Sequence, residues 1–282
     1  MMNLDSISQI VYLGPEASFS EIAKDYFCEK YGIKVYSASM PSVRQVMEYV
    51  QLNSGTLGVV PVENSIVGTV RETLDNLLSA QNSNVQILSE VIIPIQYCLL
   101  ARTTEFYSIT GVIANQQSLS QCKNFIQEDL PRNLNIIEAT NPSDAARSLQ
   151  NYNLTYASIG SRKIAEVYNL NILKENINDD KSNRTHFVLI GDIDTEPTGN
   201  DKTTLMFTTE DKPGALMEIL NIFYINSINL SHISSQPSKL EDNKYIFVVS
   251  FEGHVKEPHI AVTMSQIKER AVYFKVIGSY EN

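Results

Sequence analysis

Short apolar runs alternate with helical patterns through the first 190 residues, and this alternation limits the fold more than any other feature. The runs Gln9–Leu13, 57–62 and Gly111–Ala114 are rich in branched apolar residues, as buried strands are. Apolar residues recur at helical spacing between such runs, and capping patterns such as Ser18 with Glu21 mark helix starts. Repeated strand–helix units predict an α/β fold of mostly parallel sheets with helices on their faces.

The units form two similar blocks, which predicts two lobes. The second block covers residues from about 95 to 170, and the chain then returns to a strand pattern at 185–190. Capped helix starts from two such lobes can converge on a ligand in the cleft between them. We therefore expect residues 1–192 to form one domain with an interlobe cleft.

A polar segment at 193–201, which contains Pro197 and Gly199, predicts a linker to a smaller domain. Beyond it the order is strand, helix, strand, strand, helix, strand, over residues 203–208, 214–224, 229–234, 245–251, 258–270 and 273–279. This βαββαβ order predicts a ferredoxin-like domain over residues 202–282.

Charge and cysteine content exclude several classes of protein. The formal net charge is −10 without a block of like charges, which argues against nucleic acid and anionic membranes as partners. Cys28, Cys98 and Cys122 are odd in number and widely spaced, which favours reduced thiols. Four scattered histidines and no Cys-x-x-Cys pair predict no metal site. Without a signal-peptide pattern or a membrane-length apolar run, we expect a soluble cytoplasmic protein.

Residues 57–75 are the most informative stretch. The strand pattern at 57–62 leads into a polar turn of Glu63, Asn64 and Ser65, and helical spacing follows. Thr69 with Glu72 fits a capping box, which predicts a helix start near residue 68 or 69. The free N–H groups of such a start suit an anionic ligand. On spacing alone, an ordinary strand–helix connection explains the same pattern.

The motifs of the chain, in their order and spacing, resemble those of prephenate dehydratases that carry a C-terminal ACT domain. The matching strings are Tyr-Leu-Gly-Pro-Glu at 12–16, Val-Pro-Val-Glu-Asn-Ser at 60–65, the segments 117–122 and 183–187, Pro-Gly-Ala-Leu at 213–216 and Ile-Asn-Leu at 228–230. This resemblance implies a two-lobed, periplasmic-binding-protein-like catalytic domain followed by a regulatory ACT domain. It implies no metal and no organic cofactor.

The chain departs from the family motifs at several positions. His186 stands where the family has arginine, and Asn115 and Gln116 replace a His-Pro pair. Ala17 and Ser18 stand where glycine and threonine are usual, and Ser-Ser-Gln-Pro at 234–237 replaces Glu-Ser-Arg-Pro. An arginine fork binds a carboxylate with a permanent charge, whereas a histidine is charged only near its pKa of about 6.5.

The resemblance implies conversion of prephenate to phenylpyruvate in phenylalanine biosynthesis, with phenylalanine as the effector, and a homodimer or homotetramer. The implied residues fall into three groups: catalytic Thr185, Asn64, Ser65 and Phe187; substrate-binding Asn183, His186, Asn115, Gln117, Arg184 and Glu63; and phenylalanine-binding Gly214, Ala215, Leu216, Asn229, Leu230, Ser235 and Gln236.

Thr185 is the residue implied to assist departure of the ring hydroxyl, because its own hydroxyl can donate a hydrogen bond. Neutral amides can orient the substrate without adding negative charge. If His186 replaces the family's arginine, substrate binding weakens as pH rises through the histidine's pKa. Arg184 and Arg162 are the other cations that could take over that contact, and strand alternation places Arg184 and His186 on the face opposite to Thr185.

Three other functions remain open at this stage. The first two are an arogenate dehydratase and a prephenate decarboxylase that does not form an aromatic ring. The third is a degenerate amino-acid-binding regulator without turnover, which the substitutions at His186 and Asn115 would suit. Retention of Thr185 and of the ACT motifs argues against the decarboxylase.

Overall fold

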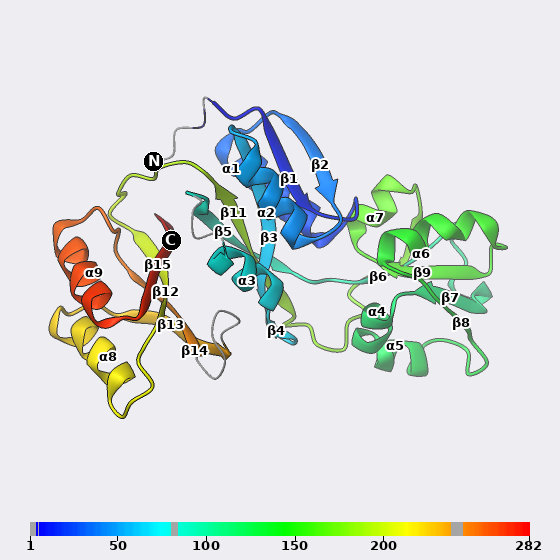
Figure 1. The fold of residues 1–282 in the computed structure, drawn as a ribbon. Coiled ribbons are helices and arrows are strands. Elements are labelled where there is room, and N and C mark those ends of the chain that lie inside the picture. The colour runs from blue at the N-terminus through cyan, green and yellow to red at the C-terminus, as the bar shows by residue number, and fades with distance from the viewer. Residues whose placement is uncertain (1–3, 5, 80–83, 238–244) are drawn as a thin grey trace.

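The computed structural model describes residues 4, 6–79, 84–237 and 245–282. Figure 1 shows three units in a row, with the first lobe in the middle, the second lobe on one side of it and the C-terminal domain on the other. The first lobe therefore shares one boundary with the second lobe and another with the C-terminal domain.

The first lobe is a mixed sheet with helices on both faces. Its strands, in spatial order, are β5 (Gln86–Pro94), β11 (Arg184–Gly191), β3 (Thr56–Asn64), β1 (Gln9–Leu13) and β2 (Tyr36–Met40), and the short β4 (Gly68–Thr69) pairs with β3. Its helices are α1 (Phe19–Tyr31), α2 (Val43–Leu52) and α3 (Arg71–Ser79). Strands β1, β2 and β3 are parallel as predicted, but β11 runs antiparallel to both neighbours because it returns from the second lobe.

The second lobe is a separate five-stranded sheet. Its strands, in spatial order, are β10 (Asn171–Lys174), β6 (Cys98–Ala101), β9 (Tyr156–Gly160), β7 (Gly111–Ala114) and β8 (Asn135–Glu138). Its helical segments are α4 (Gln116–Gln121), α5 (Lys123–Glu128), α6 (Pro142–Ser148), α7 (Arg162–Val167) and the two 3₁₀ turns Phe106–Ser108 and Leu149–Asn151. The sequence did not predict β10, which pairs with the outer edge of β6.

Two crossing segments join the lobes, and they are hydrogen-bonded to each other. The buried Asn178 accepts from the backbone of Tyr97 at 2.7 Å and donates to the carbonyl of Ile95 at 2.8 Å. Ile95 N–H in turn donates to Asn183 O at 2.9 Å. These bonds hold the two crossings together and place the start of β11 beside the cleft.

The C-terminal domain has the predicted βαββαβ order. Its elements are β12 (Asp201–Thr208), α8 (Ala215–Ile225), β13 (Leu230–Pro237), β14 (Tyr245–Glu252), α9 (Pro258–Arg270) and β15 (Tyr273–Glu281), and the sheet order is β13-β14-β12-β15. One face of this sheet packs against α8 and α9 through Phe207, Phe223, Phe251 and their neighbours. Together with the two lobes, this domain confirms the predicted fold class.

The sheet of the C-terminal domain is continuous with that of the first lobe. Strands β15 and β5 pair in parallel at Gly278 and Ile87. A Cβ atom at Gly278 would lie 2.4 Å from the carbonyl oxygen of Ile87, so only glycine fits this junction. Apolar side chains from both units form a shared core, which includes Val60, Leu77, Val188, Met206, Val248 and Ile277. No sequence pattern predicted this joining of the sheets.

Two predicted helix starts are wrong. Thr69 lies in β4, where Val70 N–H donates to Val62 O at 2.9 Å, so α3 begins only at Arg71 and the expected capping box does not form. Ser118 with Gln121 fits a capping box in the sequence, which predicts a helix start after Ser118, but α4 begins at Gln116. In both places, pairing of the preceding residues with a strand or a neighbouring side chain replaces the local capping pattern.

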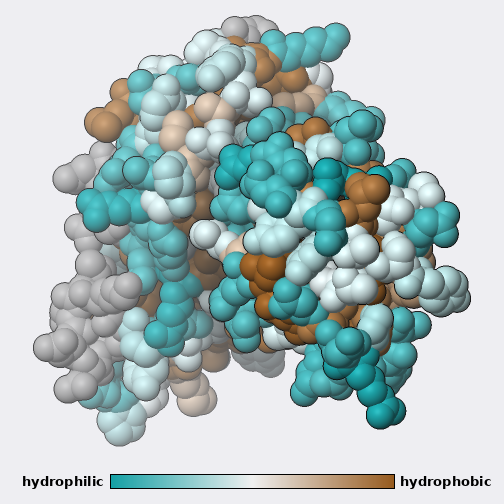
Figure 2. Space-filling model, turned by 90° about the vertical axis from the view of Figure 1, so that its right-hand side faces the viewer, coloured by the Kyte–Doolittle hydropathy of each residue, from teal (hydrophilic) through white to brown (hydrophobic). Residues whose placement is uncertain are grey.

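A view onto the second lobe shows mostly hydrophilic and intermediate residues, with hydrophobic residues in several smaller patches (Figure 2). Within the described ranges, none of the helices combines the length and the apolar character needed to cross a membrane.

His254 predicts how stability depends on pH. Its buried ring accepts from Lys256 N–H at 3.1 Å through Nδ1, and Nε2 lies 3.1 Å from Thr195 Oγ1, whose hydroxyl donates to Ser279 O. Burial lowers the pKa of the imidazole, and protonation of Nδ1 would remove the acceptor that Lys256 uses.

The unfolded chain takes up a proton on this histidine at about pH 6.5, before the folded chain does. We therefore expect the contribution of the neutral His254 to the free energy of unfolding to be complete above about pH 7.5. The free energy of unfolding should then fall as pH drops through about 6.5. Urea unfolding at pH 7.5 and 5.5 measures this. His254→Gln should reduce the pH dependence, whereas His259→Gln, on an exposed ring, should not. Equal slopes for wild type and His254→Gln would contradict this assignment.

Candidate active site

A cavity of about 160 Å³ lies between the two lobes. Its walls come from helix starts and strand ends of both lobes, namely Pro15, Ala17, Ser18, Phe19, Asn64, Ile95, Tyr97, Asn115, Gln117, Pro142, Ser143, Ser161, Ile164 and Thr185. Residues as distant in sequence as Ser18 and Thr185 therefore meet in one site. The predicted interlobe cleft exists at this place.

The starts of four helices surround the cavity. Ser18 caps α1 and Ser161 caps α7, each accepting from the backbone N–H three residues further on. Asn115 precedes α4, and Pro142 and Ser143 open α6. The first N–H groups of a helix have no partner within it. The cavity is thus bordered by helix starts, whose positive dipole ends suit an anion.

Asn64 and Thr185 form the polar centre of the site. They are register partners on β3 and β11, and Asn64 Nδ2 donates to Thr185 Oγ1 at 2.8 Å. The backbone holds the Asn64 side chain in place, because Asn64 Oδ1 accepts from the N–H groups of Ile66 and Val67 at 3.0 Å each. Since Thr185 Oγ1 accepts this bond, its hydroxyl hydrogen can point into the cavity, and the donation from Asn64 makes it a better donor.

A second layer supports this pair. The same Asn64 amide also donates to Asn183 Oδ1 at 3.0 Å, and Asn183 Nδ2 donates to Gln121 Oε1 at 3.0 Å. Asn183 is 2% exposed and does not line the cavity. It therefore orients Asn64, and it connects β11 to α4 of the other lobe.

Tyr97 and Asn115 form the other polar wall, and the buried Ser118 lies between them without lining the cavity. Ser118 Oγ donates to Asn115 Oδ1 at 2.5 Å, and a hydrogen bond joins Ser118 to Tyr97. Burial raises the pKa of the Tyr97 phenol, so the phenol is neutral at physiological pH. This wall offers hydroxyl and amide groups without a formal charge.

Among the described residues, those that line the cavity carry no charged side chain. Ion pairs join the lobes outside this lining, where Lys163 on α7 pairs with Glu21 and Asp25 on α1. Two hydrogen bonds add to this contact: Ser143 Oγ to Glu16 O at 2.6 Å and Ser161 Oγ to Ala17 O at 3.3 Å. The lobes are thus joined on one side of a neutral, donor-rich cavity.

The structure brings together four of the residues that the sequence singled out, Thr185, Asn64, Asn115 and Gln117. Ser65 and Phe187 do not line the cavity. Ser65 Oγ accepts from the backbone of Arg184 at 3.0 Å, and the Phe187 ring is buried in the core of the first lobe.

The predicted cations do not reach the cavity. Arg184 is exposed outside it, and Arg162 pairs with Glu175. Glu63 and His186 point to the opposite face of the sheet and line a different cavity, next to the C-terminal domain. This arrangement does not support a carboxylate contact for His186, and the strand alternation gives the reason.

The sequence did not single out Ser18, Tyr97, Ser143 and Ser161 as site residues. Three of them stand at helix starts, and the capping box of Ser18 with Glu21 was visible in the sequence, but a capping pattern carries no direction in space. Tyr97 lies in an apolar run and gave no signal.

Comparison with known proteins agrees with this architecture. The family model "Prephenate dehydratase" matches residues 10–195, and the model "ACT domain" matches residues 203–261. A bifunctional chorismate mutase/prephenate dehydratase of Aquifex aeolicus is 35% identical over 99% of this chain and 75% of its own. A prephenate dehydratase of Methanocaldococcus jannaschii is 35% identical over 96% of this chain and 97% of its own. The structure of a prephenate dehydratase from Arthrobacter aurescens in complex with L-Phe superimposes with a TM-score of 0.84, at 30% identity over 97% of this chain and 90% of that one.

Two lobes around a donor-lined cavity, followed by a βαββαβ domain, define a two-domain α/β enzyme with a regulatory module. The chain belongs to the prephenate dehydratase family, and its C-terminal unit is an ACT domain. It is therefore a carbon–oxygen lyase.

Proposed function

We propose that this chain converts prephenate to phenylpyruvate with Thr185 as the hydrogen-bond donor to the departing ring hydroxyl. The observation that carries the proposal is the Asn64–Thr185 pair in a neutral cavity surrounded by helix starts. Prephenate is a dianion, and such a cavity can hold it without a charged side chain.

The chemistry is a concerted loss of two groups from one ring. The bond between the ring and its carboxylate breaks, its electron pair enters the ring, and the hydroxyl on the opposite ring carbon leaves. With one proton taken up, the products are carbon dioxide, water and phenylpyruvate. Aromatisation supplies much of the driving force, so the protein has to position the substrate and stabilise the leaving oxygen.

This division of labour fits the residues present. Thr185 donates to the leaving oxygen, while Asn64 holds Thr185 in place. Backbone N–H groups near Ser18 and Ser161, with Gln117, bind the side-chain carboxylate that remains in the product. Neutral donors around the departing carboxylate avoid the strong ground-state stabilisation that a cation would give.

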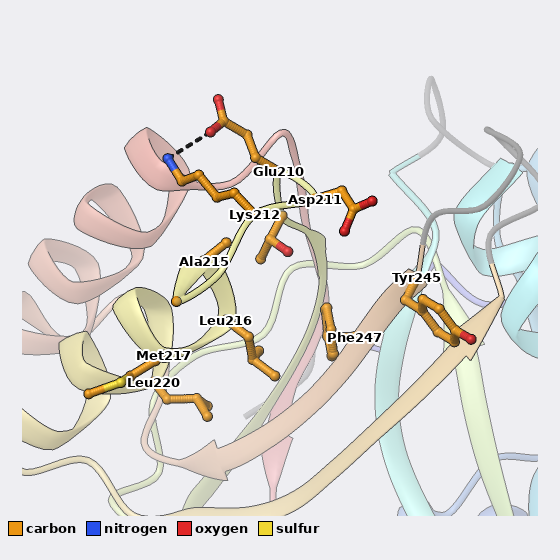
Figure 3. A pocket seen from close by; sticks show the side chains of 11 residues that line it. Glu210, Asp211, Lys212, Ala215, Leu216, Met217, Leu220, Tyr245 and Phe247 are labelled. Carbon is orange, nitrogen blue, oxygen red and sulfur yellow. Dashed lines mark ion pairs between the residues drawn. The ribbon is translucent and has the colours of Figure 1, made fainter.

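The ACT domain holds a second pocket, of about 540 Å³, that suits phenylalanine (Figure 3). Three predicted effector residues line it: Gly214, with a φ of 86°, Ala215 and Leu216. Leu216, Leu220 and Phe247 give it an apolar wall, and the start of α8 supplies N–H donors for a carboxylate. The related Arthrobacter aurescens structure contains L-Phe. These features support phenylalanine as the effector.

The other predicted effector residues, Asn229, Leu230, Ser235 and Gln236, do not line this pocket in one chain. They lie on or beside β13, the outer strand of the sheet. Large apolar side chains of this domain are exposed, namely Ile233 on β13, Tyr245 on β14, and Met217, Tyr224 and Ile225 on α8. An exposed edge strand with such residues favours self-association. We propose a homodimer or homotetramer in which a second copy's β13 completes the pocket.

Turnover tests the catalytic part of this proposal. The purified chain, incubated with prephenate, should produce the absorbance of phenylpyruvate, and the absence of this product would contradict the proposal.

The three free thiols, Cys28, Cys98 and Cys122, suit a biosynthetic enzyme of the reducing cytoplasm.

Phenylalanine binding tests the regulatory part. Calorimetry should detect binding. Inhibition should be partial, because Ser234 and Gln236 stand where the family motif has a charged pair. The coupling free energy between phenylalanine binding and activity should therefore lie below the typical range of about 1–3 kcal/mol. Leu216→Asp should abolish binding while unliganded turnover persists. Complete inhibition, or binding unchanged in Leu216→Asp, would contradict these assignments.

A further inference from the structure

A third cavity, of about 220 Å³, lies between the first lobe and the ACT domain. Its polar wall carries six titratable side chains: Glu63, Glu90 and His186 from the first lobe, and Lys202, His232 and Tyr280 from the ACT domain. The remaining wall is mainly apolar and includes Leu77, Val188, Val248 and Ile277. The cavity is therefore a joint between a catalytic unit and a regulatory one.

Strands β3 and β11 are shared between this cavity and the active site. Asn64 and Thr185 are register partners, and both face the interlobe cavity. Glu63 precedes Asn64 on β3 and His186 follows Thr185 on β11. These two residues are also register partners, and both face the ACT domain. The register shifts immediately after His186, between His186 and Phe187. A bulge locally disrupts the ladder and re-aims side chains, so the strand is less constrained at this point.

One side of the cavity is firmly anchored. Glu90 accepts from Lys202 at 2.8 and 2.9 Å and from the Tyr280 hydroxyl at 3.0 Å, which ties β5 to β12 and β15. On the other side, the His232 ring contacts Ser234 Oγ at 3.1 Å, within its own strand. In the described part of the chain, the side chains of Glu63 and His186 form neither a hydrogen bond nor an ion pair.

We propose that His186 and Glu63 are positioning residues through which the ACT domain sets the placement of Thr185 and Asn64. Movement of β13 relative to the anchored β12 and β15 changes what His186 and Glu63 pack against. Because each is adjacent in sequence to a residue of the active pair, that change shifts the Thr185 hydroxyl relative to the substrate. This inference rests on the proposed function of Thr185, and it gives His186 a role other than substrate binding.

A double-mutant cycle across the cavity tests the proposal. His186→Leu should lower kcat for prephenate about tenfold with KM within about twofold, because a small misplacement of a catalytic group is costly. His186→Gln, which keeps a polar side chain at the polar wall of the cavity, should restore most of the rate. The double variant of His186→Leu with His232→Leu should be no slower than the slower single variant. Its kcat should therefore exceed, by at least about fivefold, the value expected if the two single effects multiplied.

His259→Leu is the matched control, since His259 lies on α9 of the ACT domain, is exposed and does not line the cavity. Its effect should multiply with that of His186→Leu within about twofold. If the His186–His232 cycle is as multiplicative as this control, the proposal is overturned. A rise in KM with unchanged kcat in His186→Leu would also overturn it, because that pattern indicates substrate binding.

A spectroscopic readout separates this proposal from the proposed function. In asparagine-labelled protein, the Asn64 side-chain amide signal can be assigned by its loss in Asn64→Asp. His232→Leu should shift that signal in the wild-type background and leave it in place in the His186→Leu background. If the chain does not turn over prephenate, this shift still supports the relay; if prephenate is consumed and the signal does not move, the relay alone fails.

Discussion

Thr185→Ala is expected to lower kcat by about 10²–10⁴-fold with little change in KM. The lost hydroxyl acts on the departing oxygen in the transition state and contributes little to binding of the ground state. The fold should persist, because Asn64 keeps its bonds to Asn183 Oδ1 at 3.0 Å and to Arg184 O at 3.2 Å. Steady-state kinetics with prephenate measure the effect.

Thr185→Ser is the matched control, since it retains the hydroxyl and can still accept from Asn64. It should keep kcat within about tenfold of wild type. Thr185→Ala with more than a tenth of the wild-type kcat, which is about 1.4 kcal/mol of barrier, would remove Thr185 from the mechanism.

Gln117→Glu is expected to reduce kcat/KM about 30- to 100-fold, mainly through KM. The substitution is nearly isosteric but adds a negative charge to a cavity that otherwise has none among its described lining residues. At an effective dielectric constant of 20, two like charges about 5 Å apart repel by roughly 3 kcal/mol, and solvent in the cleft reduces this value.

Gln116→Glu provides the comparison, because Gln116 is exposed like Gln117 but does not line the cavity. Both positions lie in the first turn of α4, where a carboxylate stabilises a helix, so neither variant should unfold. Gln116→Glu should stay within about threefold of wild type. Equal losses in the two variants would mean that the anion does not bind next to Gln117.

The sequence predicted the units of the fold better than their arrangement. Strand runs and caps located the two lobes, and the capping box of Ser18 with Glu21 marked one of the helix starts that surround the cavity. The direction of β11 was not predictable, because it depends on where the chain returns from the second lobe. The junction of Gly278 with Ile87 was hidden for the same reason, since nothing local encodes a contact between distant units.

The candidate site shows the same limit. Asn64 and Thr185 are 121 residues apart, and only the register of β3 with β11 brings them together. The motif resemblance identified both, although spacing alone could not pair them. It also drew attention to His186, where strand alternation was the better guide: the side chain faces the ACT domain.

The most direct test of the central claim compares two products of prephenate consumed by the purified chain. Carbon dioxide release and phenylpyruvate formation, measured in the same sample, should proceed at equal rates, and both should fall together in Thr185→Ala. Carbon dioxide without phenylpyruvate would indicate a decarboxylase that does not aromatise the ring, and it would contradict the role of Thr185 in expelling the hydroxyl.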